Sequence, residues 1–341
     1  MSTFAAVVLF LGVLAYAVLG GADYGAGFWD LTAGGARRGR EPRHLIDTTL
    51  APVWEANHVW LIFCLVMLWT GFPGAFAAIT TTLYVPLGLA ALGIVVRGSG
   101  FAFRKVVVHT EQQRVTGAAF ATSSVITPFF LGTVAGGIAS GRVPTAGHGD
   151  PITSWVNPTS LLGGVLAVLV CAFVAAVFLT AEARRRPVPA AELERRRIAD
   201  LGRWFRRRAQ ASALVTGVVA LAGIGILRAD SPRLFDGLLS RGLPFVVVSG
   251  VCGVAALGLL GRASPRLLQA LAVTAAGTVV VGWGVAQYPY VLGTHLTIDA
   301  AAAPPATLWA LTIVAGIALV LVVPALALLF VLQQRGRLQS H

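Results

Sequence analysis

Five ionisable residues lie inside long apolar stretches of the sequence, where a charge is costly and points to a function by default. They are Asp23, Asp30, Glu55, His58 and Arg97. Carboxyl groups carry protons, an imidazole exchanges them near neutral pH, and a guanidinium favours the charged form of a carboxylate beside it. These residue types suit either a proton path inside a membrane or a buried structural ion pair.

His58 follows Glu55 by three residues, which places both side chains on one face of a helix. A lone histidine in an apolar helix is more often a hydrogen-bonded packing residue than a ligand. The three cysteines are far apart in the sequence and form no metal-ligand spacing. We therefore expect no metal and no cofactor bound directly by this chain. Ligation of a haem by two of its histidines is excluded, because the others lie outside the apolar stretches, at His44, His109, His148, His295 and His341.

The apolar stretches that hold these residues are long enough to cross a membrane. Of the 341 residues, 56% are hydrophobic and 12% are charged, which excludes an ordinary soluble enzyme. About 20 helical residues cross the hydrocarbon core, and no short alternating segments typical of a β-barrel recur. The sequence therefore predicts an all-α integral membrane protein. Nine runs qualify as spans: 4–30, 47–70, 74–97, 117–139, 159–181, 210–228, 243–260, 266–287 and 308–332.

The basic residues give an orientation. The odd-numbered connections and the C-terminal tail hold 22 of the 26 Lys and Arg residues. Because such residues stay in the cytoplasm, we expect the N-terminus outside and the C-terminus in the cytoplasm. The richest segment, 182–208, also contains acidic residues, and it is typical of an amphipathic helix lying on an anionic inner leaflet. The net charge of +12 is then explained without a nucleic-acid partner.

Three of the ionisable residues should lie at a common depth. Asp23 is about 10 Å above the inner end of the first run, and Glu55 is about 12 Å above the inner end of the second. Arg97 ends the third run on the same side. We expect a cluster of two carboxyl groups and an arginine that opens toward the cytoplasm.

Glycines and prolines surround this cluster. Gly21 and Gly25 form a small-x-x-x-small pair, which indicates close helix packing. Pro52, near the start of the second run, and Pro86, within the third, should cause local helix breaks.

Several segments in this region also form recognisable motifs. Residues 20–27 read GGADYGAG, residues 51–62 read APVWEANHVWLI, and residues 97–104 read RGSGFAFR, with Phe72-Pro73 and LYVP at 83–86 between them. The first resembles the G-x-D-x-G-x-G run, and the second the P-x-W-[DE]-x-N-x-V-W-L-I segment, of subunit II of cytochrome bd-type terminal oxidases. The others continue the likeness in the same order.

The resemblance implies a fold and a complex. In that family subunits I and II are pseudo-symmetric nine-helix proteins, each with two four-helix bundles plus one peripheral helix. We expect one membrane domain over 1–341, with the first bundle over 1–139 and the second bundle and last helix over 140–341. The protein would lie in the bacterial inner membrane as a multi-pass subunit.

The resemblance also implies an activity and partners. Subunit I holds two b-type haems and one d-type haem, oxidises quinol there and reduces oxygen to water. Subunit II is haem-free, supports subunit I, and can hold a quinone or a lipid structurally; small accessory subunits occur in the family. Asp23 and Glu55 fall on the positions of acids in a proton path from the cytoplasm, and Arg97 falls on the adjoining arginine.

The sequence departs from the family at two positions. Glu55-Ala56 stands where Asp-Gly is frequent, which keeps a proton carrier, and His58 stands where Glu or Gln is frequent. His58 either adds a relay step or blocks one. Two other functions remain open: a proton-coupled membrane transporter, which the lack of charge in the later runs disfavours, and a purely structural membrane scaffold.

Overall fold

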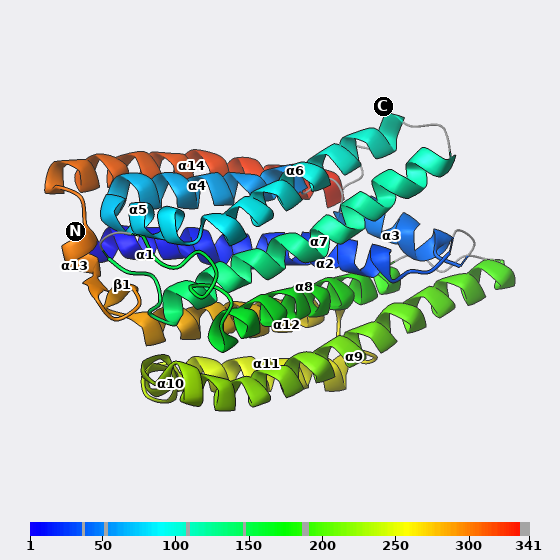
Figure 1. Ribbon diagram of the computed structural model, residues 1–341. Helices are drawn as coiled ribbons and strands as arrows, with labels where there is room; N and C mark the ends of the chain where they lie inside the picture. Colours follow the sequence, from blue (N-terminus) through cyan, green and yellow to red (C-terminus); the bar gives the residue numbers. More distant parts are fainter. Residues whose placement is uncertain (36–37, 51–53, 107–109, 146–147, 186–190, 335–341) are drawn as a thin grey trace.

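Long apolar helices make up most of the computed structural model, and they run lengthwise between two ends of the molecule (Figure 1). The structure describes residues 1–341 except 36–37, 51–53, 107–109, 146–147, 186–190 and 335–341. Beside these gaps, and near the C-terminus, some helical residues, Glu55 among them, are described by their backbone alone.

The chain folds into helices with one small hairpin. The helices are α1 (Ser2–Ala15), the π-helix η1 (Tyr16–Gly20), α2 (Gly21–Leu31), α3 (Arg40–Leu50), α4 (Trp54–Gly71), α5 (Pro73–Thr82), α6 (Tyr84–Val106), α7 (Thr110–Ala139), α8 (Pro158–Arg185), α9 (Glu192–Asp230), α10 (Pro232–Leu239), α11 (Leu243–Leu259), α12 (Pro265–Gln287), α13 (Ile298–Ala301) and α14 (Pro305–Gln334). The strands β1 (Tyr290–Leu292) and β2 (Leu296–Thr297) pair antiparallel.

The described residues of the nine predicted runs are helical, apart from Leu83 and Leu260. Within the described part of the chain, six helical stretches are long and apolar enough to span a membrane, or up to eight if each bent pair of helices is one span. The prediction of an all-α membrane protein is thus confirmed. The count of nine spans and their orientation stay predictions, as does the division between 1–139 and 140–341.

Prolines explain how the third run is divided, whereas the break predicted at Pro52 in the second run lies outside the described residues. The run 47–70 begins within α3, whose first turn contains Pro42. The chain bends by 117° between α4 and α5, where Pro73 starts α5 without a backbone N–H. Pro86 lies in the first turn of α6, so the helix that ends at Thr82 does not continue through it. The run 74–97 is therefore two helices.

The basic segment differs from its prediction. Residues 192–230 form one unbroken helix of 39 residues, so the basic stretch is not a separate helix. At 1.5 Å per residue α9 is about 58 Å long, almost twice the thickness of a hydrocarbon core. No proline falls between Glu192 and Asp230, so nothing in the chain separates the basic part from the apolar part.

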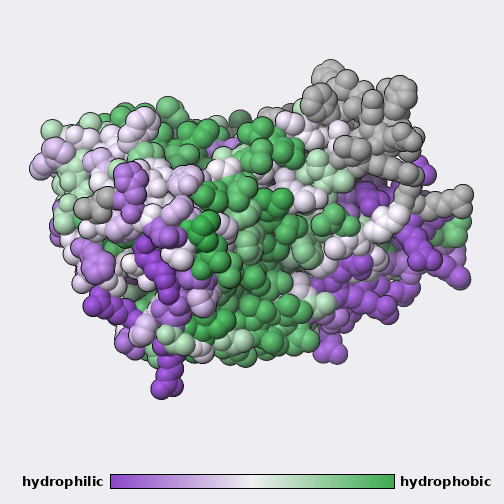
Figure 2. All heavy atoms as spheres, in the orientation of Figure 1, coloured by the Kyte–Doolittle hydropathy of each residue, from purple (hydrophilic) through white to green (hydrophobic). Residues whose placement is uncertain are grey.

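Helix α8 lies at the centre of the packing, against α2, α7, α9 and α12. One apolar core joins α8 to α2, α3, α9, α11 and α12 around residues such as Phe173 and Phe205. A second core, around Phe72 and Leu83, joins α5 to α1, α7, α13 and the hairpin. An apolar band crosses the middle of the visible face, with polar residues toward both ends (Figure 2).

We call the end that carries α3, the end of α8 and the start of α9 the basic end (Figure 1). The turn between α11 and α12 lies there too, because Arg184 of α8 donates a hydrogen bond of 2.8 Å to the carbonyl oxygen of Ala263. Connections that the sequence assigns to one side of the membrane thus lie at one end.

The opposite end is fastened by Asp230, the last residue of α9. Its carboxylate accepts two hydrogen bonds from Arg142, at 3.0 and 2.6 Å, and two from the backbone N–H and hydroxyl of Thr159, at 3.1 and 2.6 Å. Thr159 lies in the first turn of α8, and its hydroxyl is 2.7 Å from that of Ser231. One carboxylate therefore joins the loop after α7, the start of α8 and the end of α9.

Candidate functional site

The first membrane helix changes its winding just before Asp23. The π-helix Tyr16–Gly20 separates α1 from α2, and such segments are frequent at functional sites. Asn57 of α4, which is buried, donates a hydrogen bond of 3.3 Å to the carbonyl oxygen of Leu19 in this segment. The sequence alone did not single out either feature.

Close packing of α2 on α8 holds Asp23 in place. A Cβ atom on Gly25 would collide with the carbonyl group of Cys171 and would lie 2.7 Å from the Cβ of Ala175. Gly21 faces the same helix, and a Cβ atom on it would lie 3.6 Å from the sulfur of Cys171. The small-residue pair in the sequence therefore lies where two helices approach closely.

Asp23 and Arg97 form a buried ion pair between α2 and α6. Their side chains are 7% and 1% exposed, and Arg97 Nη2 donates to Asp23 Oδ1 at 2.7 Å. The same nitrogen donates to the backbone oxygen of Asp23 at 3.0 Å. The structure thus brings together two of the residues that the sequence indicated. Their role in proton transfer stays a prediction.

Residues of α7 and a ring of α2 also surround the Arg97 guanidinium. Its Nη1 donates a hydrogen bond to Ser124 of α7, whose hydroxyl in turn donates to the carbonyl oxygen of Phe120 at 2.6 Å. The guanidinium carbon also lies over the rings of Phe120 and Tyr24, at 4.3 and 4.9 Å from their centroids, in cation–π geometry. The polar pair Ser123-Ser124 within an apolar run was the available signal for this contact.

The pair leaves one atom on each side without a partner. Asp23 Oδ2 and Arg97 Nε are both buried and have no hydrogen-bond partner among the residues that the structure describes. Leaving a buried polar group unsatisfied costs about 1–3 kcal/mol, so such atoms are rare in structures and ask for an explanation. The free carboxylate oxygen is an available acceptor for a proton.

The other two predicted site residues belong to α4. Glu55 lies in the first turn of that helix, but its side chain is outside the described residues. His58 is half-buried one turn further along. The contact between Asn57 and Leu19 places this part of α4 beside the π-helix that precedes Asp23.

A second buried carboxylate lies nearer the basic end. Asp30 of α2 is 4% exposed, and its Oδ1 accepts a hydrogen bond of 2.7 Å from Arg43 Nε of α3. Arg43 also donates to the carbonyl oxygen of Gly34 at 2.6 Å. The sequence marked Asp30 as an acid in an apolar stretch but did not indicate its partner.

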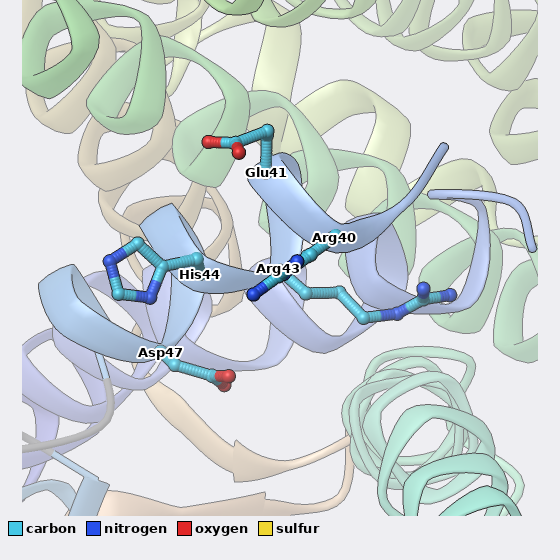
Figure 3. Close-up of a pocket in the computed structure, with 5 residues that line it drawn as sticks. All are labelled: Arg40, Glu41, Arg43, His44 and Asp47. Carbon is cyan, nitrogen blue, oxygen red and sulfur yellow. The ribbon is translucent and has the colours of Figure 1, made fainter. Parts of the chain in front are cut away.

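Arg43 also borders a cavity of about 480 Å³ on α3. Figure 3 shows that every labelled side chain extends from this one helix, with His44 and Asp47 on adjacent turns. We call this cavity the α3 pocket, and its lining residues are Arg40, Glu41, Arg43, His44 and Asp47. In the described ranges no group of three or more His, Cys, Asp or Glu residues is arranged to hold a metal ion.

The fold and the site define a multi-pass helical membrane protein with ionisable side chains buried between its first helices. The sequence profile of the family described as cytochrome bd terminal oxidase subunit II matches residues 1–333. The chain therefore belongs to this family, and the resemblance seen in its motifs is confirmed. Membership in this family and the apolar helices make it a multi-pass protein of the bacterial inner membrane.

Individual relatives agree with this assignment. The chain is similar to the cytochrome bd ubiquinol oxidase subunit 2 of Bacillus subtilis, with 28% identity over 228 residues, 65% of this chain and 61% of the relative. The cytochrome bd-I ubiquinol oxidase subunit 2 of Escherichia coli K12 is 29% identical over 231 residues, 64% of this chain and 56% of the relative. These matches span less than two thirds of each relative.

A solved structure matches more of the chain. The bd oxidase from Geobacillus thermodenitrificans has a chain that superposes with a TM-score of 0.74 at 27% identity. The match covers 96% of this chain and 97% of the other.

Proposed function

We propose that this chain is the haem-free subunit II of a bd-type quinol:oxygen oxidoreductase. Its partner would be a subunit I that holds b- and d-type haems, oxidises quinol and reduces oxygen to water. The family match over residues 1–333 and the likeness to a bd oxidase chain support this assignment. His58 is the one histidine of the sequence inside an apolar run, so the chain has no histidine pair with which to hold a haem itself.

The proposal includes an orientation and other partners. The basic end would face the cytoplasm and the N-terminus the outside, because clustered Arg residues favour the cytoplasmic side. Small accessory subunits, membrane lipid and a structurally bound quinone or lipid would complete the complex. The quinol substrate itself would bind to the partner subunit.

Within the complex, we assign Asp23, Glu55, His58 and Arg97 to a proton path from the basic end. The observation that carries this assignment is the buried Asp23 Oδ2, which has no hydrogen-bond partner among the described residues. The Arg97 guanidinium occupies the other oxygen at 2.7 Å, so a proton that reaches Asp23 would bind Oδ2. Glu55 would be a second carrier and His58 a relay deeper in the membrane.

Neutral variants of the two acids test the path. We expect Asp23→Asn and Glu55→Gln to slow oxygen consumption by the assembled complex at least about tenfold, because positioned proton carriers contribute on this scale or more. The b- and d-type absorption bands should remain at full intensity. Asp230→Asn, the same change at the opposite end, is the matched control and should leave turnover unchanged.

A purely structural role is the competing assignment, and the short, buried contact between Asp23 and Arg97 favours it. In that case both neutral variants would lower the thermal stability of the complex and turn over at the wild-type rate. That result would exclude the proton path. Proton-coupled transport by this chain alone in haem-free liposomes would instead contradict the assignment as an oxidase subunit.

A further inference from the structure

The α3 helix presents ionisable side chains in a regular order. Glu41, His44 and Asp47 follow one another at intervals of three residues, and all three are exposed. The opposite face of the helix is buried through Leu45 and Ile46, which belong to the larger apolar core. The helix is therefore fixed in orientation, with a histidine between two carboxylates turned toward the surrounding water.

Those side chains have the chemistry of a proton-collecting surface. A histidine side chain both donates and accepts protons, and a carboxylate lies about one helical turn away on either side of it. An anionic lipid headgroup is a weaker match for the same cavity. Glu41 and Asp47 would repel it, and Arg43 is already engaged with Asp30.

The α3 pocket is connected to a buried acid through Arg43. This side chain borders the pocket and also donates to Asp30 at 2.7 Å. Asp30 is thus a buried carboxylate, 4% exposed, that contacts one of the side chains lining the pocket.

Asp30 and Asp23 share one face of α2. Seven residues separate them, which corresponds to two helical turns and a rise of about 10.5 Å. Gly27 lies between them on this face, where a Cβ atom would come within 2.9 Å of Arg97 Nη1. The two carboxylates, each paired with an arginine from another helix, form a series that leads inward from the basic end.

We propose that the α3 pocket takes up protons at the basic end and that Asp30 carries them toward Asp23. The proposal rests on the proton path described above and adds its outer part. A proton from water binds the His44 ring or the Asp47 carboxylate. It then moves to a carboxylate oxygen of Asp30, so that an N–H or O–H bond breaks as a new O–H bond forms. Water molecules pass it on to Asp23, and Asp30 regains its charge.

Proton uptake by the assembled complex tests the inference. A pH-indicator dye follows uptake during a single turnover with oxygen, and oxygen consumption is measured in parallel. We expect Asp30→Asn to slow uptake about tenfold and Asp30→Glu, which keeps a titratable group, to restore most of it. The triple variant Glu41→Gln, His44→Gln and Asp47→Asn should slow uptake about threefold, because water in the α3 pocket can still supply protons beside Arg43.

Matched controls are available on α9. Glu192 and Glu194 are exposed acids at the same end, and the double variant Glu192→Gln, Glu194→Gln should take up protons at the wild-type rate. A slowing by this control equal to that of the triple variant would contradict a specific role for α3.

Three results separate this inference from the proposed function. If Asp23→Asn slows turnover while Asp30→Asn and the triple variant take up protons normally, protons enter elsewhere and the inference is wrong. If Asp23→Asn itself is unimpaired, the proton path through this subunit fails as a whole. If Arg40→Gln slows proton uptake while Asp30→Asn and the triple variant do not, the pocket holds an anion such as a lipid phosphate. That result would also overturn the inference.

Discussion

Two Asp–Arg pairs of the molecule have the same chemistry but different surroundings. Asp23 and Arg97 pair between α2 and α6, and Asp230 and Arg142 pair at the end opposite to the basic end. Asp230 accepts hydrogen bonds on both oxygens from Arg142 and Thr159. Asp23 accepts on one oxygen from Arg97, and its second oxygen has no donor among the described residues. A carboxylate whose two oxygens both accept hydrogen bonds holds helices together, whereas one with an oxygen that accepts none can also bind a proton there.

The surroundings differ as well. The Arg142 side chain is 35% exposed, so water screens its pair with Asp230, while Arg97 is 1% exposed. Removing one member of a fully buried pair leaves a charge without compensation, which is far more costly than losing a screened contact. Substitutions at the buried pair should therefore lower stability more than substitutions at the exposed pair.

The largest effect should come from Arg97→Met. Leaving Asp23 buried without its cation should destabilise the fold by about 3–5 kcal/mol. Thermal unfolding of the purified complex, followed by scanning fluorimetry in detergent, should show a clearly lower midpoint. The double variant Asp23→Asn, Arg97→Met should recover part of the loss; if it is no more stable than Arg97→Met, the ion pair is not the reason.

Gly27→Ala should be the next most damaging change. Its Cβ atom would collide with the Ser124 side chain and would lie 2.9 Å from Arg97 Nη1, so the guanidinium must shift. Overpacking of this kind costs about 1–3 kcal/mol. Gly88→Ala in α6 is the control, because a Cβ there meets nothing within 4 Å. Equal unfolding midpoints for the two variants would argue against a tightly fitted site.

These two positions also show what the sequence could reveal. The rise per residue of a helix gives the depth of each residue, so the proximity of Asp23 and Arg97 could be anticipated. Depth does not reveal which side of a helix faces its neighbour. The contacts of Arg97 with Ser124 and of Asp30 with Arg43 were therefore not predicted. The absence of proline between Glu192 and Asp230 was the available signal for the unbroken α9, whereas no residue pattern marked the π-helix before Asp23.

Asp230→Asn should have a smaller effect on stability and none on turnover. Asparagine keeps one oxygen for Thr159 but loses the charge that attracts Arg142, whose exposure reduces the contribution to about 1 kcal/mol. Unfolding midpoint and oxygen consumption should be measured on the same preparation. A turnover defect as large as that of Asp23→Asn would erase the functional distinction between the two pairs.

Arg196→Gln should have the smallest effect. Arg196 and Glu192 pair at 3.0 Å within α9, but their side chains are 75% and 64% exposed. Pairs of this kind contribute about 0.3–0.5 kcal/mol. The midpoint should therefore stay within the error of the measurement, and a marked drop would mean that the basic part of α9 contacts something besides water.

The unbroken α9 has a mechanical consequence. One continuous helix begins among the arginines of the basic end and finishes at Asp230, whose carboxylate accepts a hydrogen bond from the first turn of α8. If such a helix of about 58 Å pivots near its middle by 5°, each end is displaced by about 2.5 Å. That displacement is comparable to the length of a hydrogen bond. A tilt of α9 caused by binding at its basic part would therefore strain the hydrogen bonds of Asp230 with Arg142 and Thr159.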